Sequence, residues 1–260
     1  MREALEKLII EAGKAALRHF RTGAAITYKP DASPVTAADK EAEAIITAGL
    51  AVAFPSIPVV AEEAVSCGRT PTRIGPQYFL VDPVDGTREF VEGRDEFTVN
   101  IGLVRDGAPV AGLVYAPARG QLFEAIDGEV LEATVDGNGA IANRTPIAVS
   151  GRELPACIVA SRSHLNARTR DYLDRHAGTA CRHVGSSLKF CLVARGEADL
   201  YPSFRATMQW DTAAGDAILR AAGGETRDAE GDLLSYLPDL CVDGVHFCNP
   251  SFVATGYRRR

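Results

Sequence analysis

The 260-residue chain lacks several features that would assign it to a class at once. Its six cysteines are scattered without a CxxC pair, which predicts reduced thiols that mostly serve packing in a cytosolic protein. No stretch approaches the ~20 uninterrupted apolar residues of a membrane span. The first residues, Met1, Arg2 and Glu3, are charged, and no apolar signal core follows them. We therefore expect a cytoplasmic protein without an integral membrane segment, while peripheral association with the inner membrane stays open.

A basic excess is also missing. The net charge is −6 and the pI is about 5.5, which argues against a surface that coats nucleic acid or an anionic membrane. An anionic small molecule remains compatible with this balance, because a bound cation or a local basic cluster reverses the sign of one pocket. The expected partner is accordingly a small molecule and not a nucleic acid. The sequence does not determine the oligomeric state.

The composition is that of a globular protein, because 46% of the residues are hydrophobic. Apolar residues at the helix period predict a first helix over Leu5–Phe20. A second helix is expected from about Thr36 to Phe54, where Thr36 and Asp39 have the spacing of a capping box. From Phe97 the apolar period changes to two. Phe97–Val104 and Pro109–Tyr115, joined through an Asp-Gly turn, predict a β-hairpin.

Strands and helices alternate through the rest of the chain, which predicts an α/β layered sandwich with an antiparallel stretch in the middle. The two expected halves are residues 1–150 and residues 151–260. Asp136–Asn143 is rich in Gly and Asn and is expected to be a loop, and Asp211 is expected to open an apolar helix that ends at Gly223. The remaining predicted strands are Ile57–Ala61, Tyr78–Val81, Gln121–Ala125, Val130–Ala133, Cys157–Ala160, His183–Val184 and Asp199–Tyr201, and the remaining predicted helices are Arg168–His176 and Ser187–Arg195.

Carboxylates recur where these apolar runs finish. Glu62 and Glu63 follow one strand, Asp82 and Asp85 follow another, and Asp211 starts a helix. Each has a structural interpretation: a solvated pair, turn chemistry or a helix cap. In combination they indicate a crevice at strand ends in which like charges would repel without a cation among them. An all-oxygen set without a nearby His or Cys cluster suits Mg²⁺ and disfavours zinc.

The run Asp82–Thr87 has an internal logic that supports a metal cradle. Pro83 stiffens a turn that aims both aspartates the same way, and the Val84 carbonyl supplies a further oxygen. Gly86 lets backbone approach a ligand closely, and N–H groups at a following helix start would receive phosphate oxygens. Thr87 offers a hydroxyl that orients a water molecule. The run is therefore interpreted as a metal cradle with a phosphate seat beside it.

Asp39, the pair Glu62-Glu63, the run DPVDGT from Asp82 and the run WDTAAG from Trp210 resemble, in this order, the inositol monophosphatase superfamily. The resemblance covers nearly the whole chain and implies an αβαβα sandwich with phosphomonoesterase activity. It also implies two or three Mg²⁺ ions and inhibition by Li⁺. It makes Glu62, Asp82, the Val84 carbonyl, Asp85 and Asp211 the metal ligands, and gives Asp39, Glu62 and Thr87 the task of positioning or activating the attacking water.

Within that superfamily, four stretches resemble the CysQ type of 3′(2′),5′-bisphosphate nucleotidase. They are Asp82–Phe90, Phe97–Asn100, Ser161–His164 and Gly185–Phe190. Arg88 stands where that type usually has lysine, and Val84 stands where it usually has leucine. The resemblance implies hydrolysis of the 3′-phosphate of adenosine 3′,5′-bisphosphate, giving AMP and phosphate, and extends to 3′-phosphoadenylyl sulfate.

A substrate with two phosphates needs cationic and hydrogen-bonding groups beyond the metals. Lys189 and Arg162 are the candidate cations. Arg205 is a further candidate for binding a second phosphate, although its position in the sequence suits a surface role equally well. Lys189 and His164 each have a structural alternative. Lys189 would then be a solvated lysine on a helix, and His164 would only terminate a strand. The predicted substrate contacts are Asp85, Gly86, Thr87, Ser161, His164, Gly185, Ser186, Ser187, Lys189 and Asp211.

Two other functions stay open at this stage. One is a broader sugar or inositol phosphatase, including inositol-1-phosphatase and fructose-1,6-bisphosphatase activity. The other is a regulatory member of the fold that binds a protein or RNA. The complete carboxylate set and the acidic balance both favour the enzyme over the regulatory member.

Overall fold

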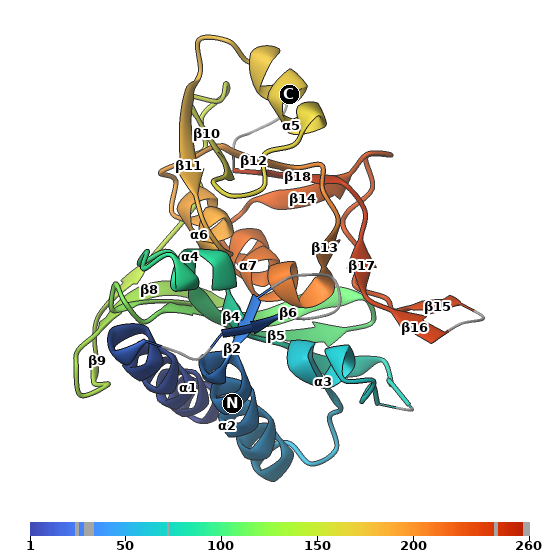
Figure 1. The fold of residues 1–260 in the computed structure, drawn as a ribbon. Coiled ribbons are helices and arrows are strands. Elements are labelled where there is room, and N and C mark those ends of the chain that lie inside the picture. Colours follow the sequence, from blue (N-terminus) through green and yellow to red (C-terminus); the bar gives the residue numbers. More distant parts are fainter. Residues whose placement is uncertain (24–25, 29–33, 72, 242–243, 257–260) are drawn as a thin grey trace.

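The computed structural model describes residues 1–23, 26–28, 34–71, 73–241 and 244–256. Helices and sheets alternate in layers, from α1 and α2 through a seven-stranded sheet, then α6 and α7, to a five-stranded sheet with α5 outside it (Figure 1). The α/β layered sandwich predicted from the sequence is confirmed. The site lies where the layers of the two parts of the chain meet.

The outer helix layer consists of α1 (Arg2–Thr22) and α2 (Ala37–Ala53), as the apolar periodicity predicts. The predicted capping box is present, since the Thr36 hydroxyl accepts from the Ala38 N–H and Asp39 accepts from the Thr36 N–H at 2.8 Å. Both helices bury one face against the first sheet in a shared apolar cluster. The cap therefore fixes where α2 starts, and with it the position of Asp39.

The first sheet has the strand order β3-β4-β5-β6-β7-β8-β9, parallel between β3 and β4 and antiparallel elsewhere. Asp106 and Gly107 have φ of 51° and 76°, as a two-residue hairpin turn requires. The predicted loop Asp136–Asn143 is wrong at its end, because β9 begins at Ile141 and pairs with β8. The strands are β3 Val59–Ala61, β4 Gln77–Asp85, β5 Thr98–Arg105, β6 Ala108–Ala116, β7 Gln121–Ile126, β8 Glu129–Val135 and β9 Ile141–Pro146, and four short elements complete this part, β1 Ile26–Tyr28, β2 Pro34–Thr36, α3 Glu62–Ser66 and α4 Thr87–Val91.

The second sheet has the order β11-β10-β12-β18-β14, with β10 parallel to both of its neighbours and the other pairs antiparallel. Two further pairs, β13 with β17 and β15 with β16, stand apart from it. The strands are β10 Cys157–Ser161, β11 Ala180–Val184, β12 Leu200–Ser203, β13 Thr207–Met208, β14 Glu225–Asp228, β15 Asp239–Cys241, β16 Gly244–His246, β17 Cys248–Asn249 and β18 Phe252–Thr255, and the helices are α5 Ala167–Asp174, α6 Leu188–Ala194 and α7 Gln209–Ala221.

Helix α7 lies directly on the first sheet although it belongs to the second part of the sequence. A Cβ atom on Gly112 would lie 2.2 Å from the Ala214 carbonyl oxygen, and one on Gly102 would lie 2.9 Å from the Ala213 Cβ. Glycine is therefore required at these two sheet positions for the helix to approach this closely. One apolar cluster includes residues of both parts of the chain. The division into domains of residues 1–150 and 151–260 stays a prediction.

The prediction that most of the cysteines serve packing is wrong for the described side chains. Cys191 is buried, but Cys67, Cys181 and Cys248 are exposed and Cys157 is half-buried, all as free thiols. The side chain of Cys241 lies outside the description. None of the helices in the described part of the chain combines the length and apolar character that crossing a membrane demands.

Candidate active site

Strand β4 brings the predicted metal cradle to the edge of a cavity. The strand continues past Asp82, contrary to the expected break, and reaches Asp85 with an irregular register against β5. The Val84 N–H donates to Asp82 Oδ1 at 3.1 Å within this irregular segment. Gly86 then has a φ of 87°, a left-handed conformation suited to glycine, and α4 begins at the next residue. The chain thus turns sharply just where its carboxylates emerge.

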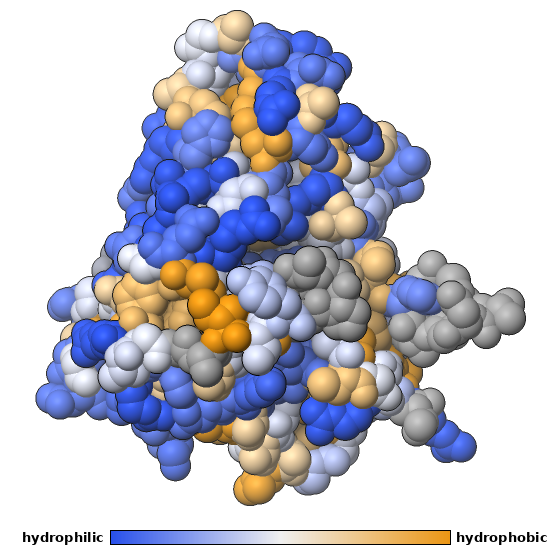
Figure 2. Space-filling view, in the orientation of Figure 1, coloured by the Kyte–Doolittle hydropathy of each residue, from blue (hydrophilic) through white to orange (hydrophobic). Residues whose placement is uncertain are grey.

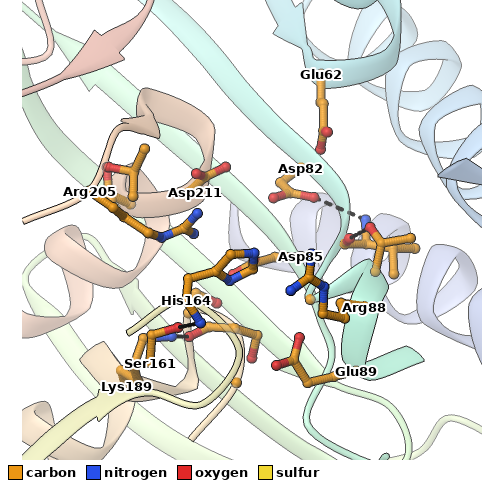
Figure 3. A pocket seen from close by; sticks show the side chains of 18 of the residues that line it. Glu62, Asp82, Asp85, Arg88, Glu89, Ser161, His164, Lys189, Arg205 and Asp211 are labelled. Atoms are coloured by element: carbon orange, nitrogen blue, oxygen red, sulfur yellow. Dashed lines mark hydrogen bonds between the residues drawn. The ribbon is translucent and has the colours of Figure 1, made fainter. Parts of the chain in front are cut away.

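A cavity of about 200 Å³ opens at this turn, and all the predicted site residues except Asp39 and the candidate Arg162 line it. Its walls come from both parts of the chain, with β4 and α4 on one side and β10, α6 and α7 on the other (Figure 3). The lining residues are Pro34, Glu62, Asp82, Val84, Asp85, Gly86, Thr87, Arg88, Glu89, Ser161, His164, Gly185, Ser186, Ser187, Lys189, Tyr201, Arg205, Thr207, Asp211 and Thr212.

Four of these form what we call the acidic wall: Glu62, Asp82, Asp85 and Asp211 (Figure 3). Burial raises the pKa of Asp82 well above its usual value, and repulsion from the other three carboxylates raises it further. The pKa of Asp211 is raised to about 7 by burial and then by Asp85. Like charges held together in this way favour a cation between them.

Glu62 owes its place to a neighbouring carboxylate on α2. It is the first residue of α3, directly after β3 ends at Ala61. The Glu63 N–H donates to Glu43 Oε2 at 2.7 Å, and Glu43 is 6% exposed. This contact satisfies a backbone donor that the start of the helix leaves without an intrahelical partner. It fixes the first turn of α3, from which Glu62 reaches the cavity.

The chemistry of the acidic wall fits a hard divalent cation. Within the described residues, no three His, Cys, Asp or Glu side chains stand in the close arrangement of a finished metal-ligand cluster. The wall nevertheless offers only oxygen donors, and its raised carboxyl pKa values show that the four charges interact through the cavity. Oxygen donors of this kind are the ligands of Mg²⁺. We therefore find that the residues present fit Mg²⁺.

Thr87 stands between two oxygen acceptors. Its hydroxyl lies 3.0 Å from the Val84 carbonyl oxygen and 3.4 Å from Asp39 Oδ1, and its one proton reaches one of them at a time. Asp39 is 1% exposed and is the N3 residue of the α2 capping box, which confirms its capping role, while its role toward the attacking water stays a prediction. Burial raises the pKa of Asp39 to about 6, while the Thr36 hydrogen bonds oppose that rise.

Three cations and His164 form a second group of cavity residues, which we call the cationic wall: Arg88, Lys189, Arg205 and His164 (Figure 3). Burial, followed by the positive charges of Arg205, Arg88 and Lys189, lowers the pKa of His164 to about 4 in all. In Figure 3 the guanidinium groups of Arg205 and Arg88 approach the imidazole from opposite sides. His164 is therefore a neutral group among positive charges, and not merely the end of a strand.

Lys189 is a buried lysine, and the alternative of a solvated helix residue is wrong. It is 5% exposed, and its ammonium group donates to the Ser186 carbonyl and lies 5.1 Å from the centre of the Tyr201 ring. Burial lowers its pKa to about 8, and Asp85 opposes this effect most strongly. In return, Lys189 and Arg205 hold the pKa of Asp85 below the value that burial alone would give. The two walls thus stabilise each other's charge.

The turn before α6 differs in part from the expected ligand seat. The Gly185 N–H donates to Glu96 at 2.9 Å and the Ser187 hydroxyl donates to Asn100 at 2.8 Å. The Ser187 N–H donates to the Asp85 carboxylate. These three donors therefore hold the turn and Asp85 in place instead of facing a ligand, because the protein already engages them. Ser186, which lies between Gly185 and Ser187, has a φ of 51° and lines the cavity.

Arg162 is not a ligand cation, contrary to its candidacy. Its guanidinium group makes two hydrogen bonds of 2.8 Å to Glu96, which is 8% exposed. Glu96 in turn holds the Gly185 N–H. Arg162 thus connects the segment after β10 to the segment before β5 and, through Glu96, to the turn at residue 185, and it acts on the site through these contacts. Ser161, which lines the cavity, accepts a 3.2 Å hydrogen bond from the His164 N–H.

Asp211 lies two residues inside α7 and not at its N-cap. The helix begins at Gln209, and Asp211 Oδ2 accepts from the Met208 N–H at 2.9 Å. The same carboxylate caps the first turn and lines the cavity as part of the acidic wall, and its role as a metal ligand stays a prediction.

The sequence did not assign five cavity residues: Pro34, Glu89, Tyr201, Thr207 and Thr212. For Glu89 a signal existed, because it is a charge two residues after Thr87 in the run that carries the motif. The other four carry no signal that distinguishes them from core or strand residues.

Comparisons with known proteins agree with this geometry. The family model described as the inositol monophosphatase family matches residues 1–256. The 3′(2′),5′-bisphosphate nucleotidase CysQ of Salmonella typhimurium is 39% identical over 259 residues, covering 99% of this chain and 100% of that protein. CysQ of Escherichia coli K12 is 40% identical over 232 residues, covering 89% of each.

Solved structures give the same result. CysQ from Bacteroides thetaiotaomicron, described as a bacterial member of the inositol monophosphatase family, superposes with a TM-score of 0.79. It is 32% identical and covers 99% of this chain and 98% of its own. An inositol monophosphatase from Anabaena has a TM-score of 0.73 at 24% identity over 98% of this chain and 90% of its own, which supports the fold alone. Enzymes of this family are generally metal-dependent phosphatases. The chain belongs to the inositol monophosphatase family.

Proposed function

We propose that this protein is a Mg²⁺-dependent phosphomonoesterase that removes the 3′-phosphate of adenosine 3′,5′-bisphosphate, giving AMP and phosphate. We extend the proposal to 3′-phosphoadenylyl sulfate. One observation carries it: a single cavity joins an acidic wall, suited to metal ions, with a cationic wall that exceeds the need of one phosphate. The similarity to nucleotidases named CysQ along nearly the full chain supports the same substrate. A cytoplasmic location is part of the proposal.

The acidic wall would hold the metal. Glu62, Asp82, Asp85 and Asp211 provide carboxylate oxygens, and the Val84 carbonyl is the fifth proposed donor. Bound Mg²⁺ ions lower the pKa of a water molecule and neutralise charge on the phosphoryl oxygens. We propose two or three such ions and inhibition by Li⁺. Lys189 and the Ser187 N–H both oppose the rise that burial causes in the pKa of Asp85, and the hydrogen bond from Ser187 orients the carboxylate.

The attacking water is oriented by Thr87 and Asp39 in this proposal. The Thr87 hydroxyl lies within reach of both the Val84 carbonyl and Asp39, so its proton points toward one of these two acceptors and a lone pair stays available to a water molecule. Asp39, with a pKa near 6, is charged at neutral pH and accepts from Thr87. Glu62 also lines the cavity and would take part in activating the water. No group on the chain needs to form a covalent phosphoenzyme for this chemistry.

The second phosphate would bind at the cationic wall. Arg88 and Arg205 supply guanidinium groups, which match phosphate oxygens in pairs, and Lys189 supplies a compact charge. Arg88 preserves the charge of the lysine that is usual at its position, and it adds the guanidinium geometry. His164 is neutral and donates or accepts one hydrogen bond according to its tautomer.

Phosphate release tests the proposal. The purified protein is given adenosine 3′,5′-bisphosphate, inositol 1-phosphate or fructose 1,6-bisphosphate, each with Mg²⁺ and each with EDTA. The expected result is a kcat/KM for the bisphosphate nucleotide at least tenfold above the other two, with release abolished by EDTA. A higher kcat/KM for inositol 1-phosphate or fructose 1,6-bisphosphate would contradict the proposed substrate. The protein would then still be a metal-dependent phosphatase, but one with another specificity. Hydrolysis that continues at the same rate in EDTA would contradict the metal.

A further inference from the structure

Glu89 is a carboxylate in a cavity proposed for anions, and neither the metal site nor the cationic wall accounts for it. It is 3% exposed and lines the cavity on the α4 side, where its carboxylate lies near Arg88 and His164 in Figure 3. A negative charge here repels phosphate oxygens. A buried acidic group beside an anion seat therefore requires a partner that donates a hydrogen bond.

The position of Glu89 relative to the phosphate seat follows from two glycines. A Cβ atom on Gly86 would lie 3.4 Å from Glu89 Oε2, and one on Gly185 would lie 2.7 Å from the Glu89 Cγ. The Glu89 side chain thus occupies the space directly over both turns. Because Oε2 lies beside Gly86, a ligand whose phosphate is seated at this turn would bring the groups next to that phosphate within reach of Oε2.

The Glu89 carboxylate is fixed by one of its oxygens. The Ser163 hydroxyl donates to Oε1, and the Arg88 guanidinium donates to the Ser163 carbonyl at 3.3 Å. The side chain therefore has a defined direction, anchored on the segment that also carries His164. A fixed acceptor discriminates between ligands because its geometry does not adapt to a ligand that lacks the matching donor.

A counter-charge role is the main alternative. Glu89 favours the charged form of Lys189, although Asp85 does so more strongly. Such a role would affect every phosphate ester that needs Lys189 by a similar factor. A hydrogen bond to the ligand would affect only those esters that carry the donor.

We propose that Glu89 determines specificity by accepting a hydrogen bond from a hydroxyl group on the carbon next to the scissile phosphate ester. In the proposed substrate this group is the ribose 2′-hydroxyl beside the 3′-phosphate. The inference rests on the proposed function and deepens it, since it selects ribonucleotides over deoxyribonucleotides at the same site.

The test compares adenosine 3′,5′-bisphosphate with its 2′-deoxy analogue on four proteins: wild type, Glu89→Ala, Glu89→Gln and Glu92→Gln. Glu92 is exposed at the end of the same helix and makes a 2.9 Å ion pair with Arg94, so its variant removes an equal charge away from the cavity. Thermal unfolding and circular dichroism verify that each variant is folded. Glu89→Gln keeps the size of the side chain and an acceptor for the Ser163 hydroxyl. It therefore tests the proposal even if Glu89→Ala disturbs the fold.

The wild type and Glu92→Gln should prefer the ribonucleotide in kcat/KM by on the order of tenfold to a hundredfold, the effect of one charge-assisted hydrogen bond. Glu89→Ala should bring the two substrates within about twofold of each other, and Glu89→Gln should fall between. A wild-type enzyme that hydrolyses both nucleotides equally would overturn the inference while keeping the proposed function. An unchanged preference in both Glu89 variants would also overturn it. A wild type that hydrolyses neither nucleotide would overturn the proposed function and the inference with it.

Discussion

The acidic and cationic walls of the cavity are built differently. Short carboxylates on regular elements form the acidic wall: two on β4, one at the start of α3 and one in the first turn of α7. The cationic wall uses long side chains, and two of its members, His164 and Arg205, lie outside helices and strands. Figure 2 shows strongly hydrophilic residues over the part that carries α5 and β11 and again over the lower part, around α1 and α2.

This difference indicates a division of labour. Short side chains on packed backbone keep ligand positions within tight limits, which metal chemistry needs. Long side chains on connecting segments adapt to the shape of a substrate and vary more readily between relatives. We therefore expect changes in the acidic wall to affect hydrolysis of every phosphate ester. Changes in the cationic wall should alter the choice among esters.

Among these variants, Asp85→Asn in the acidic wall should cause the largest loss of phosphatase activity. It removes one full charge from the proposed metal ligands, and kcat should fall on the order of a thousandfold or more. Asp95→Asn is the matched control, since Asp95 is exposed and pairs with Arg119 at 3.0 Å. Phosphate release is measured on both folded variants. A wild-type rate for Asp85→Asn would remove Asp85 from the site.

Thr87→Ala should slow turnover by about 10²–10⁴-fold, because the hydroxyl that orients the water is lost. The Mg²⁺ concentration for half-maximal activity should stay near the wild-type value, since the carboxylates remain. Thr47→Ala is the control, with a hydroxyl that donates to the Glu43 carbonyl outside the cavity. An unchanged kcat, with chemistry shown to be rate-limiting, would exclude Thr87 from the mechanism.

Lys189→Met tests the cationic wall, and Met is chosen because the side chain is buried. The kcat/KM for adenosine 3′,5′-bisphosphate should fall tenfold to a hundredfold more than that for 3′-AMP, the size of a charge-assisted contact. Lys7→Met, in α1 and outside the cavity, controls for loss of a lysine charge. Equal losses on both substrates would assign Lys189 to the support of Asp85 alone.

Arg205→Gln should produce the smallest and most local effect, a rise in the pKa of His164 from about 4. Removing a neighbouring positive charge favours the imidazolium form, so the ring would take up its proton at higher pH than in the wild type. Because burial is the larger cause, the pKa should stay below the usual value of 6.5. Proton NMR titration of the histidines measures this directly, with Arg170→Gln as the control. A wild-type pKa at or above 6.5 would contradict the cationic wall.

The sequence predicted the acidic wall because its residues carry local patterns. Asp82, Asp85 and Gly86 stand in one short run, and Asp39 and Asp211 stand at helix starts. A capping contact is present at both Asp39 and Asp211, while their roles at the metal site stay predictions. One oxygen of Asp39 accepts from Thr36 and the other lies 3.4 Å from the Thr87 hydroxyl, whereas Asp211 accepts from the Met208 N–H and also lines the cavity.

The cationic wall and its supports depended on contacts between distant segments. Arg162 was a reasonable candidate for a ligand, yet Glu96, 66 residues away, binds it. The donors of Ser187 were expected to face a ligand, yet Asn100 and Asp85 occupy them. The partner of a polar side chain is set by tertiary packing, and no local period or spacing records it. The short strands β13 to β18 were missed for the same reason.

The close approach of α7 to Gly102 and Gly112 has a consequence for biosynthesis. The ribosome synthesises all seven strands of the first sheet before it reaches residue 147. The helix that covers one face of that sheet is complete only at Ala221. At 5–20 residues per second, the nascent chain spends about 4–15 seconds with that face exposed. Chains that terminate in this interval would present an apolar sheet to their neighbours, so premature termination products of this protein should be prone to aggregation and dependent on chaperones.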